Sequence, residues 1–472
     1  MKRKYIAFIF IIVILLFSTI ATAGFWQDVT GMFSVSLSKL FKKKVTDTPI
    51  PTTSVRPFIK DYCLNSECNT LTNISFLIIT RPLFVSNLSE FIKWKKETGF
   101  KVGILTVEWI NENFAGENLG IKVRNALHSM KRTNGVKFVL LIGDTQVEGS
   151  GDEEDYISPF TQESILNSYI LERPWNVPAM YYARLGSGTY ATDTDDVMPS
   201  DLPYTTNYSW LEPPIANPRT SEINFVADIY VGRWPVRTTD ELNNIVQKTI
   251  NMHPIKKVVI IMDQSLYNPR REACLAWPPD STQEVFCYLE MQNEIRARVL
   301  NGKIPYELIL VNISNQTDAF NARDRILSIP NDTLLFESFH GSSTGIGIGE
   351  SSIHNEDFED FRYIFPLFHA ISCNIGAYYL YGRDMFSEAL IKSVRGPAIY
   401  AEIPNPYFFY LNLLAGKTVG ESYYSGTNFY VYCANTHNLM GDPSLILYEP
   451  TPELRIPPNR IPFRSRLREI IR

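Results

Sequence analysis

The chain has 472 residues, of which 45% are hydrophobic and 20% are charged, a balance that is ordinary for a globular protein with a large core. The net charge of -5 argues against nucleic acid as a partner, because nucleic-acid binding calls for a strongly basic face. A chain of this length is expected to form two or three domains.

The first 23 residues are typical of a targeting segment. Residues 2–4 are basic, residues 5–17 are almost wholly apolar, and Ala21-Thr22-Ala23 resembles a signal-peptide cleavage site. The apolar stretch is also nearly long enough to span a bilayer, so a retained membrane anchor is the alternative to a cleaved signal. Either form places the rest of the chain outside the cytoplasm, secreted or held at the outer face of a membrane.

Six cysteines are compatible with that compartment. Cys63 and Cys68 are close in sequence, as are Cys274 and Cys287, and each pair can close a short disulfide loop where conditions are oxidising. Two cysteines remain, among them Cys373. A left-over cysteine in an exported protein indicates a free thiol that can be reactive.

Residues 24–70 show no strong periodicity and are expected to be a linker. From residue 71 onward, short apolar runs alternate with helical patterns. The runs that predict buried strands are residues 76–80, 102–107 and 138–142. Such an alternation predicts a mostly parallel sheet with helices on both faces. We therefore expect an N-terminal α/β unit over residues 71–253.

An acidic, aromatic and proline-rich stretch, residues 145–222, interrupts this rhythm. One of its carboxylate clusters contains Asp193, Asp195 and Asp196. Carboxylate oxygens are hard ligands that suit Ca²⁺, so a structural calcium site is one interpretation of the cluster. A solvated acidic loop is the alternative.

The α/β pattern then runs a second time, over residues 254–450. Its expected strands are residues 258–262, 306–311, 333–339, 365–372 and 398–401, and its expected helices include residues 317–328 and 385–393. The chain is therefore predicted to contain two tandem α/β units. Residues 451–472 form a basic tail, which is either solvated or an amphipathic helix that touches a membrane surface.

Two apolar runs of the second unit end on reactive side chains. Residues 333–339 lead to His340 and Gly341, and residues 365–372 lead to Cys373. Open α/β sheets place their sites at the carboxyl ends of strands. A histidine and a cysteine brought together there can act as proton shuttle and nucleophile, with backbone N–H groups stabilising an oxyanion. A purely structural pair is the alternative, because a buried cysteine often serves as a small hydrophobe.

The segment between these runs predicts how they are arranged. Residues 355–361 have the polarity and spacing of a crossover helix, and such a crossover usually joins neighbouring parallel strands. We therefore expect His340 and Cys373 at the ends of adjacent parallel strands, which lie about 4.8 Å apart. His369 is expected in the core, and His354 on the surface.

Several stretches then match a known pattern in order. They are residues 76–80 with 91–94 and 99–102, 139–144, 227–238, 340–341, 372–376, 386–390 and 440–445. Together they resemble the gingipain-like cysteine peptidases, family C25, whose fold is related to that of caspases. The resemblance covers roughly residues 74–448, and the ordered set is more specific than any one stretch.

The resemblance implies a caspase-like catalytic unit and an endopeptidase that cleaves protein or peptide substrates through an acyl-enzyme. Carried over to matching positions, Cys373 is the nucleophile, His340 is the general acid/base, and the amides of Gly341 and Cys373 form the oxyanion hole. Some relatives orient the histidine with a third, acidic residue. Asp263 is the positional candidate, and a strand-end aspartate that caps a turn is the alternative. The chemistry requires no cofactor, although family members bind calcium.

The chain also departs from the family pattern. Relatives usually carry glycine before the catalytic histidine, whereas this chain has Phe339, which can narrow the site. The segment between the targeting sequence and the first strand is short, although the family's best-known members have a large pro-region. These departures leave open a non-catalytic surface or binding protein that keeps the fold. A metal-dependent hydrolase is poorly supported, because the sequence contains no H-E-x-x-H motif.

Overall fold

The structure is a computed structural model, and all the residues it describes belong to the compact unit Lys60–Arg472. The described residues are 62–69, 73–116, 119–144, 180–183, 197–200, 227–264, 300, 302–342, 344–370, 384–402, 406–427 and 439–449. The expected targeting segment and basic tail therefore lie outside them. Among the helices of these ranges, none combines the length and apolar character needed to cross a bilayer.

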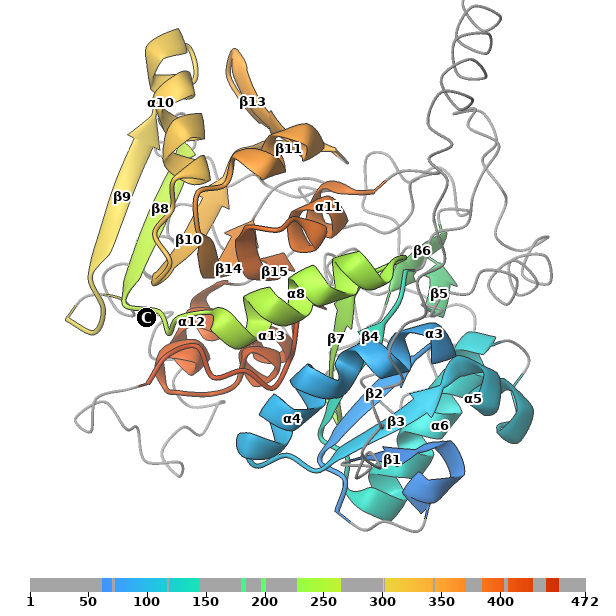
Figure 1. Cartoon of the computed structure of the whole chain (residues 1–472). Coiled ribbons are helices and arrows are strands. Elements are labelled where there is room, and N and C mark those ends of the chain that lie inside the picture. Colours follow the sequence, from blue (N-terminus) through green and yellow to red (C-terminus); the bar gives the residue numbers. More distant parts are fainter. Residues whose placement is uncertain are drawn as a thin grey trace, which may run out of the picture. The chain divides into compact units, whose positions relative to one another are not determined.

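One large sheet forms the centre of the molecule (Figure 1). Its strands, in spatial order, are β1 (Cys63–Leu64), β3 (Val102–Thr106), β2 (Phe76–Thr80), β4 (Phe138–Ile142), β7 (Tyr230–Trp234), β16 (Leu439–Met440), β15 (Gly396–Glu402), β14 (Ile364–Ala370), β10 (Thr333–Ser338), β8 (Lys257–Asp263) and β9 (Tyr306–Val311). Neighbouring strands pair in parallel except for β15 with β16. The two α/β units expected from the sequence are thus two halves of a single sheet.

The inner strands are apolar because both of their faces are covered. Every residue of β2, β3, β4 and β10 is buried. Strands of parallel sheets covered on both faces have near-continuous apolar sequences, which is the pattern that predicted them. The expected class, a mostly parallel sheet with flanking helices, is confirmed.

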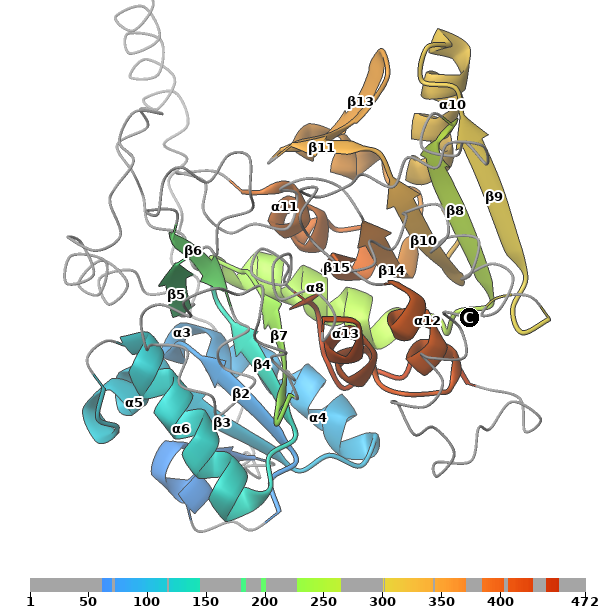
Figure 2. The ribbon, with the colours of Figure 1, turned by 180° about the vertical axis from the view of Figure 1, so that it is seen from behind.

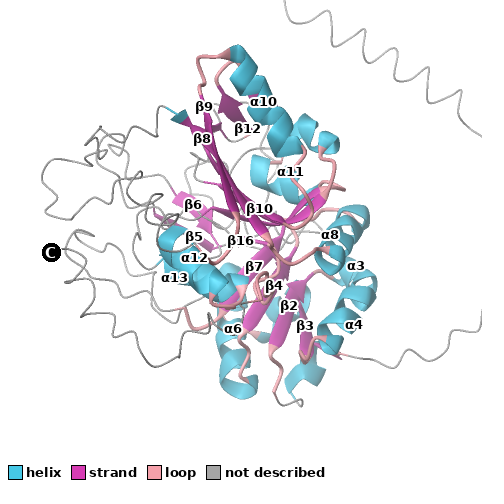
Figure 3. Cartoon of the chain, turned by 90° about the vertical axis from the view of Figure 1, so that its left-hand side faces the viewer, coloured by secondary structure: helices cyan, strands magenta, loops and turns pink. Residues whose placement is uncertain are grey.

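Helices cover both faces of the sheet (Figure 3). One face carries α3 (Pro82–Val85), α4 (Ser89–Glu97), α8 (Thr239–Asn251), α10 (Gln316–Leu327) and α11 (Phe386–Lys392) (Figure 1). The opposite face carries α5 (Val107–Asn113) and α6 (Leu119–Asn134) on the N-terminal half, and α12 (Pro406–Leu414) and α13 (Val419–Thr427) on the C-terminal half (Figure 2).

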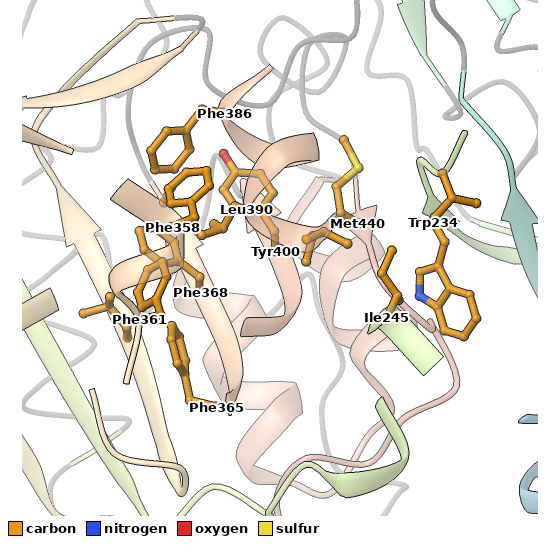
Figure 4. Packing of buried hydrophobic residues seen from close by; sticks show 14 of the residues in the cluster. Trp234, Ile245, Phe358, Phe361, Phe365, Phe368, Phe386, Leu390, Tyr400 and Met440 are labelled. Atoms are coloured by element: carbon orange, nitrogen blue, oxygen red, sulfur yellow. The ribbon is translucent and has the colours of Figure 1, made fainter. Parts of the chain in front are cut away.

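The two faces differ in how their cores are organised. On the α8 and α11 face, one hydrophobic cluster runs across both halves of the sheet and includes Trp234, Ile245, Leu390 and Met440 (Figure 4). On the opposite face, the core is divided into one cluster under each half. The halves are therefore fused through a shared core on one face only.

A short strand and the turn that follows it join the halves. Strand β16 lies between β7 and β15, and its contact with β7 is the pair Met440 and Arg233. The backbone approaches closely here, because the carbonyl oxygen of Gly441 lies 2.1 Å from the place where a Cβ on Gly232 would sit. Glycine at position 232 is therefore required by space.

A buried ion pair fixes the same turn to the N-terminal half. Lys95 of α4 contacts Asp442, and both side chains are almost completely buried. Nζ of Lys95 also donates to Oγ of Ser444 at 2.5 Å and lies 4.6 Å from the centroid of the Phe76 ring. Burial lowers the pKa of Lys95 below its usual value, and the Asp442 carboxylate offsets only part of this shift. We call this group the Lys95–Asp442 clamp.

The expected linker is shorter than residues 24–70. Strand β1 pairs with β3, and η1 (Asn65–Asn69) follows it. Cys63 and Cys68 form a disulfide, as expected for one of the two cysteine pairs, while Cys274 and Cys287 lie outside the described residues. The sequence did not indicate this edge strand, because two residues are too few to show a period.

Candidate active site

The strands that lead to His340 and Cys373 are neighbours. Strands β10 and β14 pair in parallel, with Glu337 opposite Ala370. His340 and Cys373 each follow these paired residues by three positions in the sequence, and the two strands end at the same edge of the sheet. This adjacency was predicted and is confirmed. Cys373 and the side chain of His340 lie outside the described residues, so their roles remain predictions.

The chain leaves the main sheet directly after β10. Strands β11 (His340–Ser342), β12 (Gly345–Ile348) and β13 (Ser351–His354) form a small antiparallel sheet of their own, in which His340 pairs with Gly347. The sequence did not predict this small sheet. The alternation that marks a strand was present, because Ile346 and Ile348 are buried on either side of Gly347.

The crossover between the two strands contains a helix at the predicted place, but the type of helix differs from the prediction. Residues Asn355–Asp360 form η6, a 3-10 helix, rather than an α-helix. This short element precedes β14, and its Phe358 packs into the shared core (Figure 4). The crossover still joins neighbouring parallel strands, because the small antiparallel sheet supplies the rest of its length.

Phe339 belongs to the core. Its side chain is 4% exposed and is part of the cluster on the α8 and α11 face. Its backbone N–H donates to Oε2 of Glu337 at 3.1 Å, and Glu337 is itself fully buried. The ring of Phe339 therefore packs in the hydrophobic core, which does not support the expectation that it narrows the site.

Asp263 ends the strand on the other side of β10. Strand β8 pairs with β10, with Met262 opposite Ser338, so Asp263 falls beside Phe339 in the register. Its side chain is 2% exposed. This position is compatible with a group that orients His340, and that role stays a prediction.

The other two histidines considered in this region lie in different environments. His369 is fully buried, its Nδ1 lies 2.9 Å from the hydroxyl of Tyr410, and its ring stacks on Phe336. His354 ends β13 and is exposed. His369 is therefore a core residue, as predicted.

The calcium candidates Asp193, Asp195 and Asp196 lie outside the described residues. Within the ranges that the structure describes, no group of three or more His, Cys, Asp or Glu side chains can hold a metal ion. In the stretch of sequence that contains these aspartates, β5 (Met180–Ala183) and β6 (Val197–Ser200) form an antiparallel pair that the sequence did not predict.

A cluster of charged side chains was missed by the sequence analysis. It consists of Asp144 after β4, Arg237 after β7, and Asp384, Glu388 and Lys392 in and before α11. We call it the charge cluster. The one signal in the sequence was Asp144, a charged residue that closely follows the expected strand 138–142.

Burial and mutual contact shift the pKa values in the charge cluster. Burial, together with the Asp144 carboxylate, raises the pKa of Glu388 well above its usual range. Burial alone would lower the pKa of Lys392, but the carboxylates of Asp144, Glu388 and Asp384 raise it. Lys392 therefore keeps its charge, whereas burial and the neighbouring carboxylates disfavour the charged form of Glu388.

A buried lysine of α8 contacts the C-terminal end of α11. Lys248 of α8 is fully buried, and its Nζ donates to the carbonyl oxygens of Leu390 at 3.4 Å and Ile391 at 2.6 Å. The last carbonyls of a helix lack partners within the helix, so Lys248 supplies the missing donors. Burial lowers the pKa of Lys248 to about 7, and a neutral amine still has hydrogens for both bonds.

Raising the pH from about 7 to about 9 is expected to stabilise the wild-type protein more than Lys248→Met. The folded-state pKa of about 7 lies below the usual lysine value of 10.5, so in this window the unfolded chain binds a proton that the folded chain does not. The free energy of unfolding then rises by up to about 1.4 kcal/mol per pH unit. This stabilisation is complete above the unfolded pKa and is lost as the pH falls through about 7. Denaturant unfolding at several pH values measures it, and equal slopes for the two proteins would contradict the assignment.

The comparisons with known proteins agree with this architecture. The model of peptidase family C25 matches residues 69–448. No curated protein matches the chain. Among solved structures, the chain is similar to that of the Arg-specific cysteine proteinase gingipain R, with 14% sequence identity, a TM-score of 0.51 and 80% of each chain covered. It is also similar to the complex of the Porphyromonas gingivalis RgpB pro- and mature domains, with 16% identity, a TM-score of 0.49 and 79% of each chain covered.

The first of these structures shows that the fold is the caspase-like α/β fold of gingipain. The family match extends from η1 to the segment after β16 and so includes every strand of the main sheet except β1. The chain therefore belongs to peptidase family C25, a family of cysteine peptidases.

Proposed function

We propose that the chain is an exported cysteine endopeptidase in which Cys373 is the nucleophile and His340 is the general acid/base. The observation that carries the proposal is the parallel pairing of β10 with β14, the strands that precede His340 and Cys373 in the sequence. Membership of family C25 supports the same reaction class.

The reaction proceeds in two steps. In the first, the Cys373 thiolate attacks the carbonyl carbon of the scissile peptide bond, and the amides of Gly341 and Cys373 stabilise the oxyanion. The C–N bond breaks as His340 donates a proton to the leaving amine, which leaves a thioester on Cys373. In the second step, His340 takes a proton from water, the water oxygen attacks the thioester, and Cys373 is released. Asp263 orients His340 in this proposal.

Labelling with a thiol-reactive peptide probe tests this function. The folded protein is expected to take up one equivalent of the probe at Cys373, and peptide mapping by mass spectrometry locates the label. Prior alkylation of Cys373 should prevent both labelling and peptide cleavage. A folded protein that is neither labelled at Cys373 nor cleaves any of a set of peptides would instead be the non-catalytic binding protein.

Export is part of the proposal. The basic and apolar start of the chain supports it, and so does the Cys63–Cys68 disulfide, because disulfides persist in oxidising compartments. The protein is expected outside the cytoplasm, secreted or attached to the membrane through residues 1–23. Recovery of the full-length chain in the cytoplasmic fraction of its own cells would contradict this.

Calcium is expected to raise the melting temperature of the protein, because the carboxylates of Asp193, Asp195 and Asp196 are suitable ligands. A ligand that binds the native state at about 100 times its Kd stabilises it by about 2.7 kcal/mol. Thermal melts with added calcium and with chelator measure the effect. A variant with asparagine at all three positions is the control and should lose the response, and an indifferent wild-type melt would count against the site.

A further inference from the structure

Two adjacent acceptor motifs for N-linked glycosylation lie between β9 and α10. Asn312-Ile-Ser314 and Asn315-Gln-Thr317 each match Asn-x-Ser/Thr, the sequon that is glycosylated in exported proteins. We call residues 312–317 the double sequon. The motif alone is a weak signal, because the chain contains further matches that begin at Asn73, Asn87, Asn207 and Asn331.

The side chains that define the double sequon are all on the surface. A sequon consists of an asparagine, which receives the sugar, and a hydroxyl residue two positions later, so both have to be accessible. Asn312 and Asn315 are exposed, and so are the hydroxyl residues Ser314 and Thr317. The folded protein therefore presents both complete motifs to solvent.

The other described sequons are each less accessible. Asn331 is exposed, but its hydroxyl residue Thr333 is fully buried as the first residue of β10. Asn87 is half-buried. Asn73 is exposed, but Ser75 is half-buried and its Oγ accepts a backbone N–H at 3.2 Å. Exposure of the whole motif thus distinguishes the double sequon from these three.

Hydrogen bonding leaves the amide nitrogens of the double sequon available. Oδ1 of Asn312 accepts the backbone N–H of Ser314 at 3.2 Å. Oδ1 of Asn315 accepts the backbone N–H groups of Thr317 at 3.0 Å and Asp318 at 3.3 Å, which caps α10. Among the described residues, no group accepts a hydrogen bond from Nδ2 of either asparagine. By contrast, Nδ2 donates a hydrogen bond in Asn113, Asn125, Asn134, Asn251, Asn355 and Asn412.

The double sequon also lies at an open edge of the main sheet. Within the described residues, β9 is the last strand on its side of the sheet, and Asn312 directly follows it. Figures 1 and 2 show β9 at this margin, with α10 near the end of the strand. All residues of β9 except Val311 are only partly buried. An open apolar edge can pair with another chain unless it is covered or charged.

We propose that the double sequon carries an N-linked glycan, which shields the open edge at β9. The inference rests on the export that is part of the proposed function. The co-reactant is a lipid-linked oligosaccharide. Nδ2 of the asparagine bonds to the anomeric carbon of the first sugar, the bond from this carbon to the lipid phosphate breaks, and the phosphate leaves with the electron pair while the amide loses one proton. Oδ1 keeps its bond to the backbone, so the cap of α10 is preserved. A glycan is bulky and hydrophilic, which suits an edge that has to stay unpaired.

Mass spectrometry of the protein purified from its own cells tests the site. Peptides that cover residues 312–317 are expected to carry the added mass of a glycan, and those that cover Asn87 and Asn331 are expected to be unmodified. Ser314→Ala/Thr317→Ala keeps both asparagines but lacks the motif, so it should lose the added mass. Ser314→Thr/Thr317→Ser exchanges the two hydroxyl residues and should keep the added mass. Asn331→Gln is the matched control and should leave the glycan unchanged.

Each outcome separates the glycan from the rest of the proposed function. Unmodified residues 312–317 in protein recovered outside the cytoplasm overturn the inference and leave export standing. Unmodified protein recovered only from the cytoplasm rejects both. A glycosylated protein that takes up no thiol probe at Cys373 keeps the inference and rejects the catalytic proposal.

Self-association measures the shielding of the edge. Ser314→Ala/Thr317→Ala is expected to form oligomers at a several-fold lower concentration than the wild type, because its edge at β9 is uncovered. The variant with exchanged hydroxyl residues should match the wild type. Light scattering over a concentration series measures the difference, and equal association of the wild type and Ser314→Ala/Thr317→Ala would overturn the shielding role.

Discussion

Alanine in place of Cys373 is expected to abolish peptide cleavage and to leave the fold intact. The acyl-enzyme forms on the sulfur, and alanine offers no nucleophile in its place. Removal of the nucleophile in a comparable covalent mechanism lowers kcat by on the order of 10⁶-fold. Steady-state hydrolysis of a fluorogenic peptide measures the loss, and a thermal melt of the same sample shows that the fold is unchanged.

Serine at the same position sharpens the test. Cys373→Ser keeps the size of the side chain, but a hydroxyl is far less ionised than a thiol and is a poorer nucleophile beside a histidine. It should therefore be nearly as inactive as Cys373→Ala. Cys433→Ala is the matched control, because it removes another cysteine to which no role is assigned, and it should retain full activity. Wild-type rates in purified Cys373→Ala would reject the mechanism.

Asp442→Ala is expected to lower the free energy of unfolding by about 3–5 kcal/mol, the cost of leaving a buried charge without its partner. Lys95 is 1% exposed and would keep only neutral partners such as Ser444 near its ammonium group. The same substitution removes the acceptor of the Ser444 N–H and hydroxyl bonds, at 3.0 and 2.8 Å. Denaturant unfolding measures the loss.

Two comparisons identify the cause. The double variant Lys95→Met/Asp442→Leu replaces the ion pair by apolar side chains and should recover part of the lost stability, because neither charge is then buried alone. Lys131→Ala breaks the more exposed pair with Asp228, at 2.8 Å, and should cost no more than about 1 kcal/mol. Equal losses in Lys131→Ala and Asp442→Ala would show that the clamp is no stronger than a surface pair.

The sequence predicted those parts of the fold whose cause is local. Strands β2, β4 and β10 are buried on both faces, so their apolar runs are visible without any partner. The alternation of these runs with helical patterns predicted the mostly parallel sheet. The adjacency of the strands before His340 and Cys373 followed from the length and polarity of their crossover.

The remaining features depend on contacts that leave no local pattern. Lys95 and Ser444 are 349 positions apart, and nothing near either residue indicates the other. Arg237 and Asp384 meet only because α8 and α11 pack side by side on the sheet. Strand β16 has two residues, which is too short for any periodicity. The division into two tandem units arose because the sequence could not show that this strand completes one sheet.

The late position of β16 in the chain sets an order of assembly during synthesis. A chain leaves the ribosome from its N-terminus, so β7 is available from residue 234 and β15 from residue 402, but the strand between them is made only at residues 439–440. Until then each of these strands lacks its β16 partner and has backbone groups available to pair with another chain. A nascent chain that stops before residue 439 keeps both edges open and is prone to aggregate, whereas completion of the last strand removes both edges at once.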